Sequence, residues 1–173
     1  MHNSNVAITA AVDAIIYHFL CKNGLRCLYG VRIMGVYIQA KNSKRGFHMA
    51  YSSFNTLRIF IARAMDQEFG DNYAHLRDCY HPDDFAEQEQ QADIIIKRND
   101  LTKYQDIIDF LYLSDCDGKV SYKVCKRIYD LIKDIPFAES NIQYEVFLTE
   151  DEYTDFKKFL QDCYSHRRSM VWY

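Results

Sequence analysis

Apolar side chains recur at helical spacing along most of the chain between residues 54 and 163, and this periodicity constrains the fold more than any other feature. Positions three and four residues apart share one face of an α-helix, so each apolar stripe predicts a helix with one buried face. The stripes predict helices over residues 52–69, 82–98, 101–113, 121–135 and 149–163, with a shorter one over 71–79. The chain is therefore expected to fold mainly by packing helices together.

Residues with strong end preferences mark where several of these helices begin and stop. Ser52 or Ser53 is placed to cap the first helix, and Gly70 is placed to end it. Pro82 suits the first turn of a later helix. Thr149 and Glu152 have the spacing of a capping box, which predicts the start of the last helix.

Two short segments alternate in polarity instead, as half-buried strands do. Residues 34–40 and 47–51 alternate and are separated by the polar segment 41–46, so they predict a β-hairpin. Residues 170–173 predict a further short strand beside it. The expected fold class is α+β and mostly helical, with four to six helices packed against a small antiparallel hairpin or sheet.

The first 33 residues differ from the rest of the chain. Residues 6–21 are nearly all apolar, but they contain Asp13 and are shorter than the roughly 20 residues that span a bilayer. We expect a short buried helix there. Met34 has the character of a natural start, so residues 1–33 are interpreted as a hydrophobic helical extension upstream of it, and residues 34–173 as a single α+β domain.

The cysteines indicate a reducing compartment. The six are Cys21, Cys27, Cys79, Cys116, Cys125 and Cys163, and they form neither a CxxC motif nor a zinc-finger spacing. We find no convincing secretory signal, so the interpretation is reduced thiols and a cytoplasmic protein. The same search yields no cofactor motif, no catalytic residue and no metal ligand set.

Charge is distributed unevenly around a net value of −3. Residues 1–50 carry +5 and residues 51–173 carry −8. This balance argues against direct nucleic-acid binding, because binding to phosphate backbones needs clustered Lys and Arg. It suits contact with a basic partner surface. The candidate partner contacts are Asp83, Asp84, Glu87, Glu89, Glu150, Asp151, Glu152 and Asp155.

The most distinctive local sequence is the turn motif Ser114-Asp115-Cys116-Asp117-Gly118. It looks like half of a calcium loop, but the aligned loop would have Leu113 and Val124 where carboxylates are required. A structural turn is the preferred interpretation. Gly118 is expected in a left-handed conformation, an aspartate is expected to accept free turn amides, and Ser121 is expected to cap the next helix.

Several segments of the sequence resemble those of a known group of proteins. Met34-Gly35, residues 47–54 (FHMAYSSF), residues 110–118 (FLYLSDCDG) and the later Cys125 resemble small proteins encoded in phage and prophage genomes that carry the Ser-Asp-Cys-Asp-Gly motif. The similarity runs from Met34 to the end of the chain. It implies a phage setting and no particular chemistry.

Three functions follow as hypotheses. The first is a binding protein that contacts a host or phage protein, including a nucleoprotein complex, and modulates a host factor or inhibits a defence system in the manner of an anti-CRISPR protein. The second is a metal-dependent enzyme using Asp115 and Asp117 with His75 or His81. The third is a nucleotide- or nucleic-acid-binding module built on two basic segments with aromatic residues nearby. One segment is Lys41, Lys44 and Arg45 with Tyr37, Phe47 and Tyr51, and the other is His166, Arg167 and Arg168 with Trp172 and Tyr173.

Overall fold

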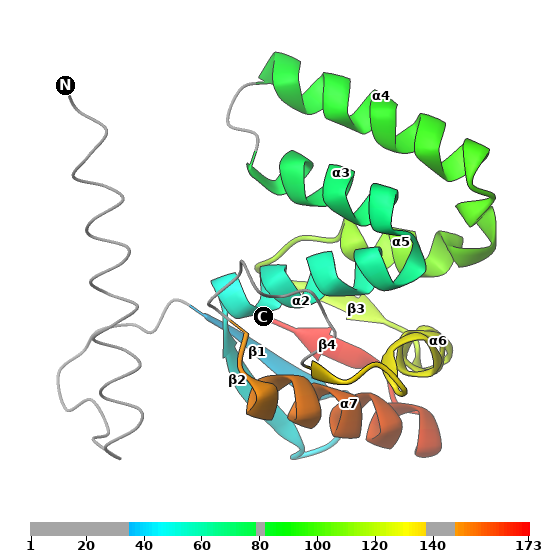
Figure 1. Cartoon of the computed structure of the whole chain (residues 1–173). Coiled ribbons are helices and arrows are strands. Elements are labelled where there is room, and N and C mark those ends of the chain that lie inside the picture. The colour runs from blue at the N-terminus through cyan, green and yellow to red at the C-terminus, as the bar shows by residue number, and fades with distance from the viewer. Residues whose placement is uncertain (1–34, 79–81, 138–147) are drawn as a thin grey trace, which may run out of the picture. The chain divides into compact units, whose positions relative to one another are not determined.

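The computed structural model describes residues 35–78, 82–137 and 148–173 (Figure 1). The predicted N-terminal extension and His81 lie outside these residues. The described elements are β1 (Gly35–Ala40), β2 (Gly46–Ala50), α2 (Tyr51–Met65), α3 (Gln67–Asp78), α4 (Pro82–Arg98), the 3₁₀-helix η1 (Leu101–Tyr104), α5 (Gln105–Leu111), β3 (Gly118–Val120), α6 (Tyr122–Ile132), α7 (Glu150–Ser165) and β4 (Met170–Trp172).

The four described strands form one antiparallel sheet in the order β2-β1-β4-β3. The predicted hairpin is present, with Val36 opposite Met49 and Ile38 opposite Phe47. The predicted strand near residue 170 is also confirmed, and it pairs with β1 through Ile38 and Trp172. β3 was not predicted, because three residues following a turn are too few to show an alternating pattern.

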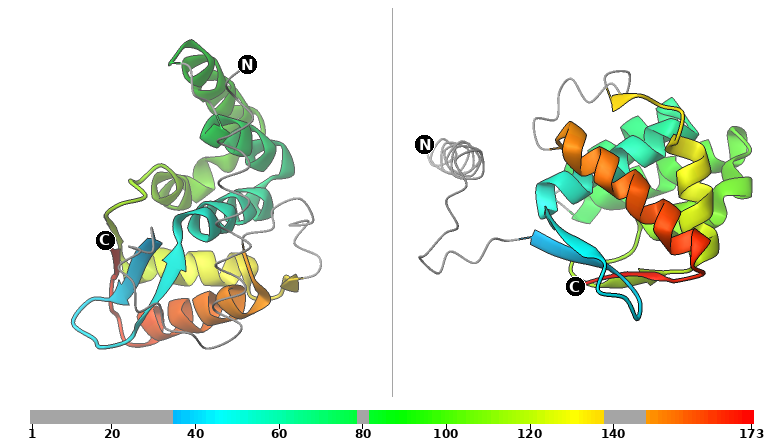
Figure 2. Two further views of the ribbon diagram at one scale, coloured as in Figure 1. Left: turned by 90° about the vertical axis from the view of Figure 1, so that its left-hand side faces the viewer. Right: turned by 90° about the horizontal axis from the view of Figure 1, so that it is seen from below.

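The sheet has one buried face. Val36, Ile38 and Ala40 alternate along β1 and are fully buried, and Met170 and Trp172 are buried from β4. The described helices all lie on this side of the sheet (Figure 2). Phe47 packs its ring against Phe159 of α7 at a centroid distance of 5.4 Å. Apolar burial between sheet and helices therefore forms the core.

The helix predicted over residues 52–69 is present as α2, but the prediction of both of its ends is wrong. α2 begins at Tyr51 with Ala50 as its N-cap and no side-chain cap, so neither Ser52 nor Ser53 has the predicted role. The chain leaves the helix at Asp66, whose carboxylate accepts the backbone N–H of Phe69 at 2.9 Å and starts α3.

Gly70 is consequently inside α3 and does not stop α2. A Cβ on Gly70 would lie 2.5 Å from the backbone of Arg63, so the missing side chain lets α2 and α3 approach closely. In the sequence, a glycine that ends a helix looks the same as a glycine that lets two helices approach closely. Only the packing distinguishes a stop from a close crossing.

α4 is confirmed from Pro82 and is the most exposed long helix of the described chain. Ala92 and Ile95 are its only buried residues, and both lie in its second half. Its first half is held to α3 by one hydrogen bond, in which Asn72 donates to Gln88 at 2.8 Å. α4 lies in the layer of the molecule farthest from α7 (Figures 1 and 2).

The predicted caps of the last two helices are confirmed. Ser121 accepts the backbone N–H of Val124 and begins α6. Thr149 and Glu152 form a complete capping box at the start of α7. At the other end, the N–H of Arg168 donates to the carbonyl of Cys163 at 2.8 Å, and Arg167 takes a left-handed φ of 54°. This reversal directs the chain into β4.

The predicted fold class is confirmed as a mostly helical α+β fold with an antiparallel sheet. Among the described helices, none combines the length and the apolar composition that crossing a membrane requires.

Candidate binding surfaces

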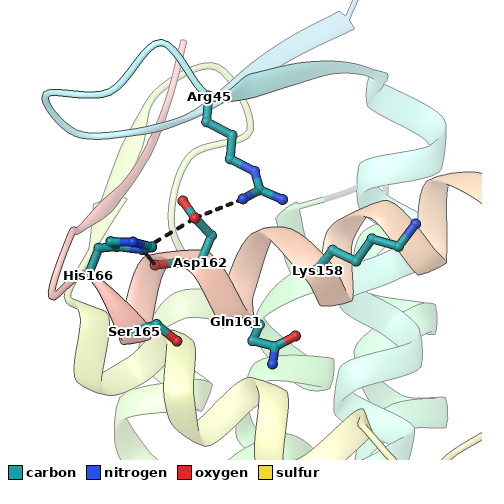
Figure 3. A pocket seen from close by; sticks show the side chains of 6 residues that line it. All are labelled: Arg45, Lys158, Gln161, Asp162, Ser165 and His166. Carbon is teal, nitrogen blue, oxygen red and sulfur yellow. Dashed lines mark hydrogen bonds and ion pairs between the residues drawn. The ribbon is translucent and has the colours of Figure 1, made fainter.

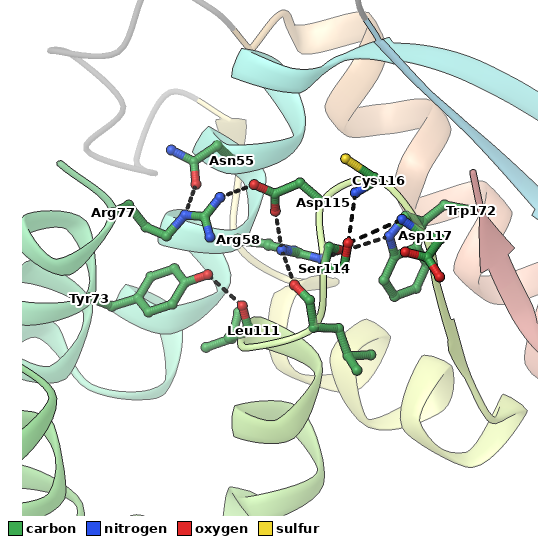
Figure 4. A network of polar contacts seen from close by, with 11 residues as sticks. Asn55, Arg58, Tyr73, Arg77, Leu111, Ser114, Asp115, Cys116, Asp117 and Trp172 are labelled. Carbon is green, nitrogen blue, oxygen red and sulfur yellow. Dashed lines mark hydrogen bonds and ion pairs between the residues drawn. The ribbon is translucent and has the colours of Figure 1, made fainter. Parts of the chain in front are cut away.

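The turn motif lies between α5 and β3, and Ser114 organises it (Figure 4). The hydroxyl of Ser114 accepts the backbone N–H of Cys116 at 3.1 Å and that of Asp117 at 3.4 Å. The prediction gave this role to an aspartate and is wrong on that point. A serine hydroxyl two residues before an amide satisfies it in the same way, so the aspartates are available for other contacts.

Asp115 uses its carboxylate to hold two arginines from different helices. Arg58 of α2 donates to one oxygen at 2.5 Å, and Arg77 of α3 donates to the other. Arg77 is itself positioned by Asn55, which accepts from its Nε at 2.8 Å. The turn is thus tied to α2 and α3 at one point, because a carboxylate can accept from two guanidinium groups at once.

Arg58 is the most unusual residue of the described chain, because its side chain is 0% exposed. Its guanidinium lies over the rings of Phe54, Phe110 and Trp172, at 4.4, 5.3 and 5.6 Å from their centroids. Burial lowers the pKa of this guanidinium, and the charge of nearby Asp115 acts in the opposite direction. Aromatic faces and a carboxylate together compensate a charge removed from water.

The remaining donors of Arg58 bond backbone carbonyls of the turn. Nη1 donates to Leu113 at 2.9 Å and Nη2 to Ser114 at 3.2 Å, while Nε is buried with no hydrogen-bond partner among the described residues. Sequence reasoning missed Arg58 and Arg77. The one available signal was an arginine four residues after Phe54 on an otherwise apolar helix face.

Gly118 is a strand residue and does not take the predicted left-handed turn conformation. A Cβ there would lie 2.0 Å from the ring of Trp172, so glycine is required for the close approach of the indole. The indole N–H donates to the carbonyl of Ser114 at 2.9 Å. Trp172, Gly118 and Arg58 therefore lock the turn against the core.

This arrangement gives the predicted acid pair separate surroundings. Asp115 is turned toward Arg77, whereas Asp117 lies on the other side of the turn near Trp172 (Figure 4). Within the described ranges, the Asp117 carboxylate makes no hydrogen bond or ion pair, and no three His, Cys, Asp or Glu side chains are grouped to hold a metal ion. Cys116 is exposed, and Cys125 is buried in the core.

The predicted acidic contacts fall on two distant surfaces. Asp83, Asp84, Glu87 and Glu89 are exposed on the first half of α4, whereas the others belong to the start of α7, in a different layer (Figure 1). Two of the α7 acids already have structural partners: Glu152 completes the capping box, and Asp155 pairs with Lys158 at 3.4 Å. The α4 acids make no ion pair with any described residue.

The two basic segments singled out in the sequence lie side by side (Figure 3). Arg45 of the hairpin loop forms an ion pair with Asp162 at 2.8 Å, and Nδ1 of His166 after α7 lies 3.3 Å from the same carboxylate. These residues line an open hollow of about 250 Å³ together with Lys158, Gln161 and Ser165. Asp162 is 8% exposed and fixes the hairpin loop to α7. Arg45 is neutralised there, but Lys41 and Lys44 of the same loop are exposed.

None of the described helices covers the sheet face opposite the core (Figure 2). Tyr37, His48 and Tyr173 lie there on three neighbouring strand positions, with Tyr37 between the other two. The ring of Tyr37 is 4.6 Å from that of His48 and 5.6 Å from that of Tyr173, measured between centroids. Phe47 and Trp172, which the sequence grouped with them, face the core instead.

Comparisons of the chain with family models, with curated proteins and with solved structures find no match.

Proposed function

We propose that this protein acts by binding another protein, and that the first half of α4, residues 82–91, makes the contact. The observation that carries the proposal is the exposure of this half-helix to solvent. Every residue in this half-helix is exposed except Gln88, although it belongs to a 17-residue helix in a well-packed fold. A helix that buries so little of itself contributes little to its own fold, so it is available for another surface.

The chemistry of this half-helix suggests the partner. It has four acidic side chains and no basic one, and Phe85 among them is 39% exposed. Clustered charge of one sign accelerates encounter with a surface of the opposite sign, and a partly exposed aromatic ring supplies a site for apolar anchoring. The expected partner surface is basic with a small apolar pocket.

The setting comes from the resemblance to phage and prophage proteins. We propose a host or phage protein as the partner, with a host factor or a defence system as the target of modulation. Such a system includes nucleoprotein complexes, whose protein components are often basic. The proposed compartment is the cytoplasm, where buried thiols such as those of Cys125 and Cys163 are kept reduced.

Affinity capture from a host lysate tests the proposal. The α4 variant carries Asp83→Asn, Asp84→Asn, Glu87→Gln and Glu89→Gln, which preserve shape and remove charge. The matched control carries Glu150→Gln and Asp151→Asn, which remove exposed charge from α7 and leave its capping box intact.

We expect a stoichiometric partner with the wild-type protein and with the α7 control, and at least about tenfold less with the α4 variant. Capture should also weaken as salt rises, because exposed charges are screened. A wild-type protein that recovers no stoichiometric partner, or an α4 variant that recovers it unchanged, contradicts the proposal.

A further inference from the structure

We propose that the open face of the sheet binds single-stranded nucleic acid, with Tyr37, His48 and Tyr173 as a stacking platform and Lys41, Lys44 and Lys119 as phosphate contacts. This activity is separate from the proposed contact through α4, which lies in another layer of the molecule (Figure 1).

The aromatic residues form one row across three adjacent strands. His48 is the register partner of Tyr37, and Tyr37 and Tyr173 exchange backbone hydrogen bonds of 3.0 and 3.3 Å. The row therefore runs from β2 over β1 to the residue that follows β4. Neighbouring strands are about 4.8 Å apart, so the three rings adjoin one another. The plane of Tyr37 is tilted by 43° to that of His48 and by 62° to that of Tyr173, and the row is therefore a surface of three tilted rings. Bases of any sequence can stack on such a surface because each has a π-face.

Two of the rings are held in position before any ligand arrives. Tyr37 lies over Gly46 of the neighbouring strand, where a Cβ would be only 2.6 Å from the tyrosine oxygen. Tyr173 is 61% exposed, and its hydroxyl donates to the side chain of Gln39 at 3.1 Å. A ring fixed in this way loses little conformational entropy on binding, which favours stacking affinity.

Positive charge lies beside the aromatic row. Lys119 of β3 is the register partner of Val171, and Val171 faces Gln39, so these residues form the next row of the sheet. Lys41 is bonded to Ser169 through its backbone in the row after that. With Lys44 of the hairpin loop, three exposed lysines make no ion pair with any described residue. Asp117, the exposed residue that precedes β3, places one acidic side chain near these lysines in the sequence.

The net charge of −3 does not decide the question, because exposed charges farther away than about 8–10 Å are largely screened at physiological salt. The acidic half of α4 is in the outer helical layer, whereas the lysines are at the sheet. Single strands are favoured over duplex because a duplex presents its phosphates but keeps its bases stacked inside. A platform of rings gains nothing from bases that it cannot reach.

Fluorescence anisotropy with the full chain tests this inference. The probes are fluorescein-labelled oligo-dT and oligo-U of about twelve nucleotides and a duplex of the same length, each at about 50 and 200 mM salt. The platform variant carries Tyr37→Leu and Tyr173→Leu, and its control is Tyr112→Leu, an exposed tyrosine on α5's C-terminal side. The lysine variant carries Lys41→Gln, Lys44→Gln and Lys119→Gln, with Lys97→Gln on α4 as its control.

We expect single strands to bind more tightly than the duplex, and the platform variant to lose at least about tenfold in affinity. Comparing oligo-dT with oligo-U shows whether the protein prefers single-stranded DNA or single-stranded RNA. Three phosphate contacts predict a slope of about −2 for the logarithm of affinity against that of salt concentration, and the lysine variant should flatten it. Both control variants should bind as the wild type does.

Photocrosslinking to an oligonucleotide containing 4-thiouridine gives a readout that needs no variant and stands even if the platform variant does not fold. We expect crosslinked peptides containing Tyr37, His48 or Tyr173. Three results would overturn the inference: no saturable binding at low salt, equal binding of duplex and single strand with no effect of the platform variant, or crosslinks confined to other surfaces.

Discussion

Replacing Asp115 with alanine tests whether the acids of the turn motif are structural. The change removes the carboxylate that pairs with both Arg58 and Arg77. Arg58 is 0% exposed and always charged, so its guanidinium is left in the core without a counter-charge. Removing one partner of a fully buried pair costs about 3–5 kcal/mol.

The geometry of the site makes the expected loss in the free energy of unfolding smaller than that. Asp115 is 33% exposed, so water can enter the space that its carboxylate leaves. Arg58 also keeps two backbone carbonyl acceptors and three aromatic faces. We therefore expect a loss of about 2–3 kcal/mol in the free energy of unfolding. For a chain of this size, that corresponds to a fall of roughly 4–12 °C in the melting temperature.

Urea denaturation followed by far-UV circular dichroism measures the loss, and Asp117→Ala is the matched control. The Asp117 carboxylate is exposed and unbonded among described residues, so its removal should change the free energy of unfolding by no more than about 0.5 kcal/mol. Combining Asp115→Ala with Arg58→Met should recover part of the loss, since the unpaired charge is then removed as well. Equal effects of the two alanine variants would refute the reasoning.

Two further predictions concern Trp172 and Tyr153. Gly118→Ala places a Cβ 2.0 Å from the indole ring and should lower the free energy of unfolding by about 3 kcal/mol. The fluorescence of the single tryptophan should also shift in the native state. A melting curve and an emission spectrum like those of the wild type would contradict this prediction. Tyr153 donates to the carbonyls of Ile132 and Ile135, so Tyr153→Phe should cost about 1 kcal/mol at pH 7. Burial raises the pKa of Tyr153 to about 12, above the value near 10 of an unfolded chain. Its protonated form is therefore favoured by folding, and the wild type should lose stability on the order of 2 kcal/mol as pH rises from about 10 to 12, whereas the phenylalanine variant should not lose that part. Denaturation curves across this pH range that stay parallel for the two proteins would show that Tyr153 is not responsible.

Local signals predicted the elements whose ends are set by neighbouring residues. The hairpin, the start of α4 at Pro82 and the capping box at Thr149 each depend on a few consecutive side chains, and each is confirmed. The prediction failed where a residue's role depends on a distant contact. Gly70 and Gly118 both look like turn glycines in sequence, but each is required by a close approach, to Arg63 and to Trp172.

The candidate surfaces follow the same division. Exposure of the α4 acids was predictable, because that half-helix has no apolar face to bury. The aromatic row was not predictable as a set, since strand alternation places Tyr37 outward but does not show which residues of β4 lie beside it. The pairing of β1 with β4 brings together residues 37 and 173, and that pairing is a property of the whole fold.

The position of β4 in the sheet has a consequence for how the protein folds. β4 follows all other described elements in the chain, yet it lies between β1 and β3. Until it docks, β3 has no neighbour among the described strands, the guanidinium of Arg58 lacks one of its three rings, and the carbonyl of Ser114 lacks the indole donor. Contacts between residues so far apart form slowly. The helices should therefore collapse first, and burial of the indole should complete the sheet, the arginine site and the turn in one late cooperative step.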